Sequence, residues 1–290
     1  MEITLASAAG LLSWRGEWRK IPTPLAHPTL LTPCGTGVAL ADPVSRQLYR
    51  QGRIRALPTG VVALRCWRER LLMLSSETNC LTLCDVHDNP QVTSPAGIRP
   101  CDCCISGAFA VVCGGEDGCL HLFSLPELRE VAAYPVPGCP MRVIAADGVL
   151  TCLSLMSPDP PQSLLFRFCP ATEDFAPVAL LPGLCGAIAA TPTGSLWVGV
   201  GEQLLHFPLA SVVPDVRLGG FGLITSLSCQ DSQLLIGDSW AGRCLLMDAC
   251  PPYALHPLYT GECGQCCFAS CRKGTLPDWK ASLNEPEITR

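Results

Sequence analysis

The chain has 290 residues, of which 48% are hydrophobic and only 16% are charged, so it carries ample apolar material for a folded core. Its net charge of −5 argues against nucleic-acid binding, because phosphate contacts need a basic surface. Small basic clusters such as Arg65, Arg68 and Arg70 are interpreted as solvated strand faces. The longest uncharged stretch, residues 175–201, is interrupted by prolines and indicates strands rather than a membrane helix. We therefore expect neither a nucleic acid nor a membrane as partner.

A unit of short strands recurs along the chain. A small residue closes the first strand of each unit, and successive members of this column are 32 to 45 residues apart. The column consists of Cys34, Cys66, Cys104, Ala145, Ala190, Cys229 and Cys271. Repeats of about 40–45 residues are typical of four-stranded β-propeller blades.

The predicted strands follow one another in chain order. Three short strands, at residues 3–5, 11–14 and 18–21, precede the first complete unit. Apolar second strands are predicted at 38–40, 71–74, 109–112, 150–153, 196–198 and 234–236. Third strands are predicted at 47–49, 81–83, 120–123, 164–166, 204–207 and 245–247. Gly and Pro end each unit, since neither continues a central strand, and no stretch keeps the 3.6-residue period of a helix.

The last unit is incomplete. Its first strand, at 266–271, is followed by too few residues for three more strands. We expect residues 1–28 and 263–290 to share this blade in a three-plus-one arrangement, with a two-plus-two split that uses residues 275–276 as the alternative. Pairing the chain ends leaves no open sheet edge. The sequence thus predicts one all-β domain over residues 1–290, a seven-bladed β-propeller closed by strands from both termini.

Twenty cysteines are unusual in a protein expected to be cytoplasmic, where thiols are kept reduced. That location is expected because Glu2 stands where a signal peptide carries positive charge. Cysteine and alanine interchange in the column, which indicates small, free thiols used for packing. The same role is expected for Cys80, Cys84, Cys119, Cys152, Cys169 and Cys244.

A second group of cysteines precedes or opens first strands, on the face where the mouth of the central channel would lie. Cys263 and Cys266 have the C-x-x-C spacing of zinc or redox pairs, and thiolates favour zinc or iron–sulfur clusters. The alternative function is therefore a metal- or thiol-dependent protein. Its candidate ligands are Cys101, Cys103, Cys139, Cys185, Cys263 and Cys266. Outside this alternative no cofactor is expected.

The turns between second and third strands are rich in Gly and acidic residues and should lie on the same face. Trp240, beside Arg243, has the residue type enriched at interaction hot spots. An acidic rim with an aromatic anchor would receive a basic peptide or a cationic ligand. The candidate binding residues are Trp240, Arg243, Glu116, Asp117, Asp159, Asp238 and Arg142. We expect a protein or peptide partner, or a small ligand, and no catalytic residues, because no catalytic motif is present.

Two stretches resemble the turns of known propeller repeats. Residues 189–199 and 144–150 carry a small residue, Pro or Asp, Gly and Leu in the order found in the WD-repeat and YVTN-type (YncE-like) superfamily. The Trp-Asp pair itself is missing, and Cys84-Asp85 and Met247-Asp248 are its nearest approaches. The resemblance implies a rigid, non-catalytic binding scaffold that presents its channel-mouth face.

Overall fold

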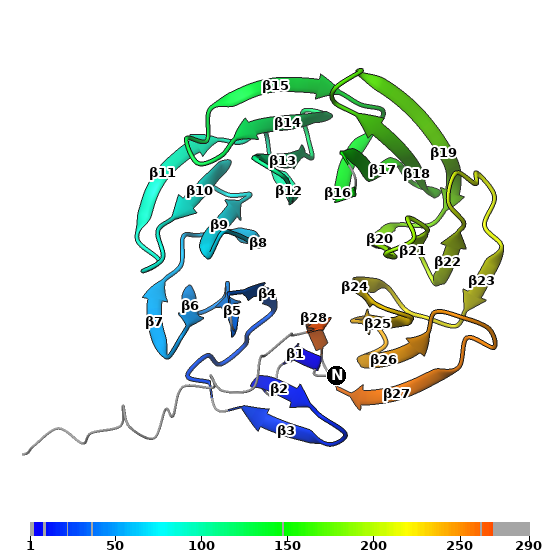
Figure 1. Ribbon diagram of the computed structural model, residues 1–290, viewed down its shortest axis with the longest axis horizontal. Coiled ribbons are helices and arrows are strands. Elements are labelled where there is room, and N and C mark those ends of the chain that lie inside the picture. The colour runs from blue at the N-terminus through cyan, green and yellow to red at the C-terminus, as the bar shows by residue number, and fades with distance from the viewer. Residues whose placement is uncertain are drawn as a thin grey trace, which may run out of the picture.

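Seven four-stranded sheets stand in a ring around a central opening in the computed structural model (Figure 1). The structure describes residues 3–7, 10–21, 23–35, 37–146, 148–261 and 263–268. These residues form 28 strands and no helix, so they contain no helical segment that would span a bilayer. The predicted all-β class and the seven-bladed propeller are confirmed.

Six blades run in chain order from the axis outward (Figure 1). Blade 1 is β4 (Leu30–Cys34), β5 (Gly37–Asp42), β6 (Gln47–Arg50) and β7 (Arg53–Ala56). Blade 2 is β8 (Val61–Trp67), β9 (Arg70–Ser75), β10 (Cys80–Cys84) and β11 (Pro90–Pro95). Blade 3 is β12 (Pro100–Ser106), β13 (Phe109–Gly114), β14 (Cys119–Ser124) and β15 (Glu130–Pro135). Blade 4 is β16 (Cys139–Ala146), β17 (Val149–Pro158), β18 (Pro161–Cys169) and β19 (Asp174–Pro182). Blade 5 is β20 (Cys185–Ala190), β21 (Leu196–Val200), β22 (Gln203–Phe207) and β23 (Val216–Gly219). Blade 6 is β24 (Ile224–Gln230), β25 (Gln233–Asp238), β26 (Arg243–Asp248) and β27 (Leu255–Thr260).

The closing blade combines strands from both ends of the chain. Its order from the axis is β28 (Cys263–Phe268), β1 (Ile3–Ser7), β2 (Gly10–Trp14) and β3 (Trp18–Ile21). β28 pairs antiparallel with β1, with Leu5 opposite Cys266. The predicted three-plus-one closure is confirmed. Cys271 and the alternative strand at 275–276 lie outside the described residues.

Burial is greatest in the middle strands of each blade and lowest in the outermost strands, while the innermost strands are partly exposed along the axis. In β9 the run of residues 71–74 is almost fully buried, because blades cover both faces of the strand. Outer strands such as β11 and β15 alternate between exposed and half-buried positions. The apolar side chains pack between neighbouring blades, as where Leu72 and Leu74 of blade 2 share a cluster with Val112 and Phe123 of blade 3. The core is therefore a circle of interblade contacts.

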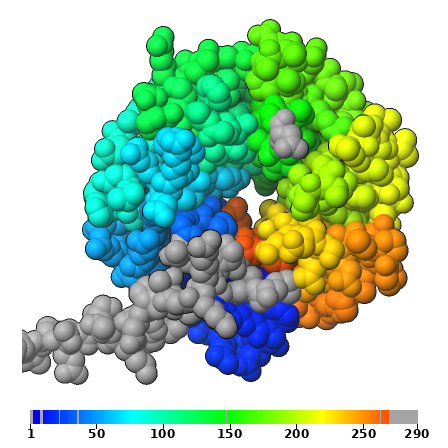
Figure 2. Space-filling view, in the orientation of Figure 1, coloured from blue at the N-terminus to red at the C-terminus, as the bar shows by residue number. Residues whose placement is uncertain are grey.

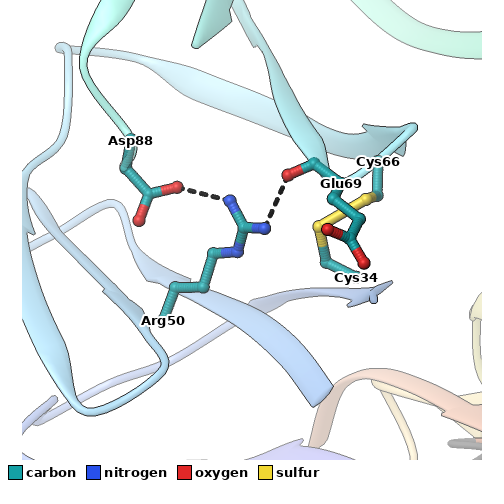
Figure 3. The surroundings of a disulfide bond; sticks show 5 residues. All are labelled: Cys34, Arg50, Cys66, Glu69 and Asp88. Carbon is teal, nitrogen blue, oxygen red and sulfur yellow. Dashed lines mark hydrogen bonds and ion pairs between the residues drawn. A yellow bond between two sulfur atoms is a disulfide. The ribbon is translucent and has the colours of Figure 1, made fainter. Parts of the chain in front are cut away.

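Blades 1 and 2 share a disulfide and a buried ion pair (Figure 3). Cys34 at the end of β4 is bonded to Cys66 of β8, with 5.4 Å between their Cα atoms. The expectation that both are free packing thiols is wrong, because neighbouring innermost strands bring them within disulfide reach. Beside them, Arg50 Nη1 lies 2.7 Å from Asp88 Oδ1, and Arg50 Nη2 donates to the carbonyl oxygen of Glu69 at 2.6 Å. The side chains of Arg50 and Asp88 are only 3% and 6% exposed.

Replacing Arg50 by Ala tests the ion pair. The variant leaves the Asp88 carboxylate buried without its partner, so we expect the free energy of unfolding to fall by about 3–5 kcal/mol in denaturant titration. Arg53→Ala, at an exposed position of β7, is the control and should change it by less than about 0.5 kcal/mol. Equal effects of the two substitutions would show that the buried pair does not hold blades 1 and 2 together.

Candidate functional site in the axial channel

The innermost strands carry a repeated irregularity. Their pairing with the second strand shifts register in five of the complete blades, between Pro100 and Asp102 in β12, for example, and between Pro140 and Arg142 in β16. The closing blade has a shift in the pairing of β28 with β1. Residues at these irregularities that line the central cavity are Val62, Cys101, Met141, Ala187, Thr225 and Gln265. An extra residue of this kind re-aims side chains, and here it turns them toward the axis.

The central cavity has a volume of about 640 Å³, and innermost strands of all seven blades contribute to its wall. Its opening is visible at the centre of the ring in Figure 2. The wall combines apolar side chains with neutral polar ones, and Thr32, Thr225, Ser226, Ser228 and Gln265 are among the lining residues. We refer to this cavity as the axial channel.

A salt bridge crosses the channel wall between blades 2 and 3. Arg65 Nη2 lies 2.6 Å from Asp102 Oδ1, and Asp102 Oδ2 accepts the backbone N–H of Val143 at 3.2 Å. Asp102 therefore connects three consecutive blades. Burial lowers the pKa of Arg65, but the neighbouring Asp102 carboxylate and nearby cysteines together raise it by more, so the net pKa is above its usual value. The expectation that Arg65 is a solvated strand face is wrong, because β8 is an innermost strand.

Arg142 is the predicted binding residue that the structure places in the channel wall. It is half-buried, follows the irregularity of β16, and donates through Nη1 to the carbonyl oxygen of Met141 at 2.8 Å. Within the part of the chain that the structure describes, no carboxylate forms an ion pair with Arg142. Arg99 also lines the channel and pairs with exposed Glu116 at 2.9 Å.

The carboxylate of Asp238 is fully buried and holds its own turn. It accepts the N–H of Gly222 at 3.0 Å and that of Ala241 at 3.4 Å, and Arg243 Nε lies 2.9 Å from it. Arg243 also donates to the carbonyl oxygen of Gly220. These contacts fasten the segment between blades 5 and 6 to the β25–β26 turn, so the Asp238 carboxylate is not available to a partner.

Asp117 has a similar structural environment in blade 3. It accepts the N–H of Ile98 at 2.8 Å and that of Cys119 at 3.1 Å, and its Oδ2 lies 3.0 Å from His121 Nε2. The other ring nitrogen of His121 lies 2.7 Å from Glu130. Asp117, Cys119 and His121 place potential metal-ligating atoms within 4.8 Å of one another. Both His121 nitrogens already have carboxylate partners, so we assign this cluster a structural role.

Two predicted rim residues are freely exposed. Asp159 lies in the exposed β17–β18 turn, and Trp240 in the β25–β26 turn is 71% exposed. Trp240 packs beside Gly222, where an added Cβ would lie 2.9 Å from the Trp240 Cβ. The aromatic anchor therefore stands on the face formed by the second-to-third-strand turns.

The six candidate metal-ligating cysteines are dispersed. All six lie in the described ranges, and no three of them bring their sulfur atoms within 4.8 Å of one another. Cys263 donates to the carbonyl oxygen of Arg243 at 3.2 Å, and Cys266 hydrogen-bonds Ser226 at 3.6 Å. Burial raises the pKa of Cys103 to about 12, and those of Cys185 and Cys263 to about 11. Such thiols stay protonated at neutral pH, whereas metal ligation needs the thiolate.

No known protein family matches the sequence, and no curated protein matches it. Solved structures resemble it in fold. A protein from Lactobacillus plantarum has a TM-score of 0.74 at 10% identity, with 91% of this chain and 98% of that chain covered. A putative 6-phosphogluconolactonase from Bacteroides fragilis has a TM-score of 0.69 at 10% identity, covering 91% of this chain and 96% of that chain. A chain of a nidogen/laminin complex has a TM-score of 0.63 at 9% identity, with coverage of 93% and 99%. These identities show the propeller fold alone, so function must be argued from the site.

Thiol labelling distinguishes packing cysteines from reactive ones. Cys139 is exposed, whereas Cys103 is fully buried with a raised pKa, so in the native protein we expect iodoacetamide to label Cys103 at least about tenfold more slowly. Peptide mass spectrometry after timed labelling measures both rates. In guanidinium the difference should disappear. Rapid labelling of Cys103 in the folded protein would contradict its burial between blades.

Proposed function

We propose that this protein is a non-catalytic binding scaffold of the WD-repeat and YncE-like propeller type, and that it holds its ligand in the axial channel. The observation that carries this proposal is the cavity of about 640 Å³ into which all seven innermost strands present side chains. Ligand pockets in proteins commonly measure about 300–1,000 Å³. A channel made by regular strands also offers a rigid, preformed surface.

The groups in the channel wall suit binding better than acid–base catalysis. Among its described lining residues the ionisable groups are three arginines, Asp102 and three cysteines, with no histidine, lysine or glutamate. Asp102 is occupied by Arg65 and by the N–H of Val143. A general base has to be free to accept a proton from the substrate, and Asp102 lacks that freedom.

A protein or peptide partner would reach the channel across the face that carries Trp240. An exposed tryptophan on this face supplies a large apolar contact of the kind enriched at interaction hot spots. A segment of the partner would then enter the channel, while its flanking residues contact the second-to-third-strand turns. A small ligand would use the channel alone.

Filling the channel tests the proposal. Ser228 lines it and is half-buried, so Ser228→Trp should obstruct the space, whereas Val131→Trp adds the same ring at a position 56% exposed on outer strand β15. We expect binders found by ligand-observed NMR in a library of short peptides and metabolites to lose at least about tenfold in affinity with Ser228→Trp only. Unchanged unfolding midpoints show that both variants fold. Binders that tolerate Ser228→Trp, or a lack of any binder, would contradict a channel site.

A further inference from the structure

The channel wall differs in charge from the chain as a whole. The full chain has 25 acidic residues against 20 Lys and Arg, whereas the described wall has Arg65, Arg99 and Arg142 against the single carboxylate of Asp102. Charges inside a concave, low-dielectric surface focus the electrostatic field more than the same charges on an open surface. The wall of this acidic protein's channel thus carries an excess of arginines, of which Arg99 is 73% exposed.

Two of these three arginines are already neutralised. Arg65 is paired with Asp102 at 2.6 Å, and Arg99 with Glu116 at 2.9 Å. Arg142 has no such partner within the described ranges, and the one hydrogen bond of its guanidinium there is to the carbonyl oxygen of Met141. A guanidinium carries five N–H donors, so Nε and Nη2 of Arg142 remain to be satisfied from the channel.

The position of Arg142 is fixed by the backbone around it. It follows the register shift of β16, and Val143 next to it donates its N–H to Asp102 of blade 3. Burial raises the pKa values of Cys101 and Cys185, and the Arg142 charge opposes both rises, which places its guanidinium near blades 3 and 5 as well as its own. The backbone that carries the guanidinium is thus preorganised for a ligand.

We propose that the axial channel binds a small organic or inorganic anion through a carboxylate or phosphate group held by Arg142. This inference rests on the channel being the binding site and adds the chemical class of the ligand. The planar guanidinium presents parallel N–H donors that match two oxygens of either group. The hydroxyl of Ser228 and the amide NH2 of Gln265, whose Oε1 accepts the N–H of Leu31 at 2.9 Å, supply neutral hydrogen bonds for the rest of the ligand. The proposed ligand is negatively charged, whereas the acidic turns suggest a positively charged one. The carboxylates of Asp238 and Asp117 in those turns already accept hydrogen bonds from the protein's own backbone.

Titration with inorganic phosphate and with citrate tests the inference by isothermal calorimetry at low and high salt. At least one of the two should bind one site per chain, more weakly at high salt, and the tighter probe identifies phosphate or carboxylate as the preferred group. Arg142→Gln should weaken that binding at least about tenfold, since it removes the hydrogen bonds made by the charged guanidinium. Arg142→Lys keeps the charge but loses the paired donors, so its affinity should lie between those of the native protein and Arg142→Gln.

Arg217→Gln is the matched control, because it removes the same charge from an exposed position on β23. It should leave both titrations unchanged. The inference is overturned if neither anion binds, or if Arg142→Gln and Arg217→Gln have equal effects. If a different ligand binds, and Ser228→Trp weakens its binding while Arg142→Gln does not, then the channel is the site and only the anion assignment is wrong.

Discussion

The pairing of β28 with β1 is the contact on which the rest of the architecture depends. It joins the two ends of the chain in one sheet and leaves both blade 1 and blade 6 with a neighbour. Leu5 and Cys266 of this sheet then pack with Leu235 of blade 6, while Ala6 and Cys267 pack on its other side toward blade 1. Because each blade buries its apolar faces against two neighbours, closure completes the core and surrounds the axial channel at the same time.

The ring separates two uses of charge. On the turns, carboxylates such as those of Asp238 and Asp117 accept backbone N–H groups and fix the segments that cross between blades. In the channel, guanidinium groups predominate, and Arg142 is left without a carboxylate among the described residues. Acidic residues such as these thus serve to build the turns. The chemistry offered to a ligand is set instead by a few cationic positions on innermost strands.

Local signals in the sequence were sufficient for the fold and insufficient for the site. Apolar runs such as residues 71–74 and the Gly/Pro turns predict individual strands, and the missing strands of the last unit predict closure. The register shift at Cys101 depends on the partner strand, and the Arg65–Asp102 pair joins residues of different blades. The Cys34–Cys66 disulfide is equally non-local. Since disulfides persist mainly in oxidising compartments, the redox state of that pair bears directly on the cytoplasmic location expected from the sequence.

Amide hydrogen exchange in the closing blade tests the central claim most directly. If β28 and β1 close the ring, the amides of Thr4–Ala6, and at least one of the Cys267 and Phe268 amides, should be protected to a degree similar to those of β9 in blade 2. Exchange of either strand at the rate of an unstructured chain, while β9 stays protected, would show that the ends do not pair and that the channel is not enclosed.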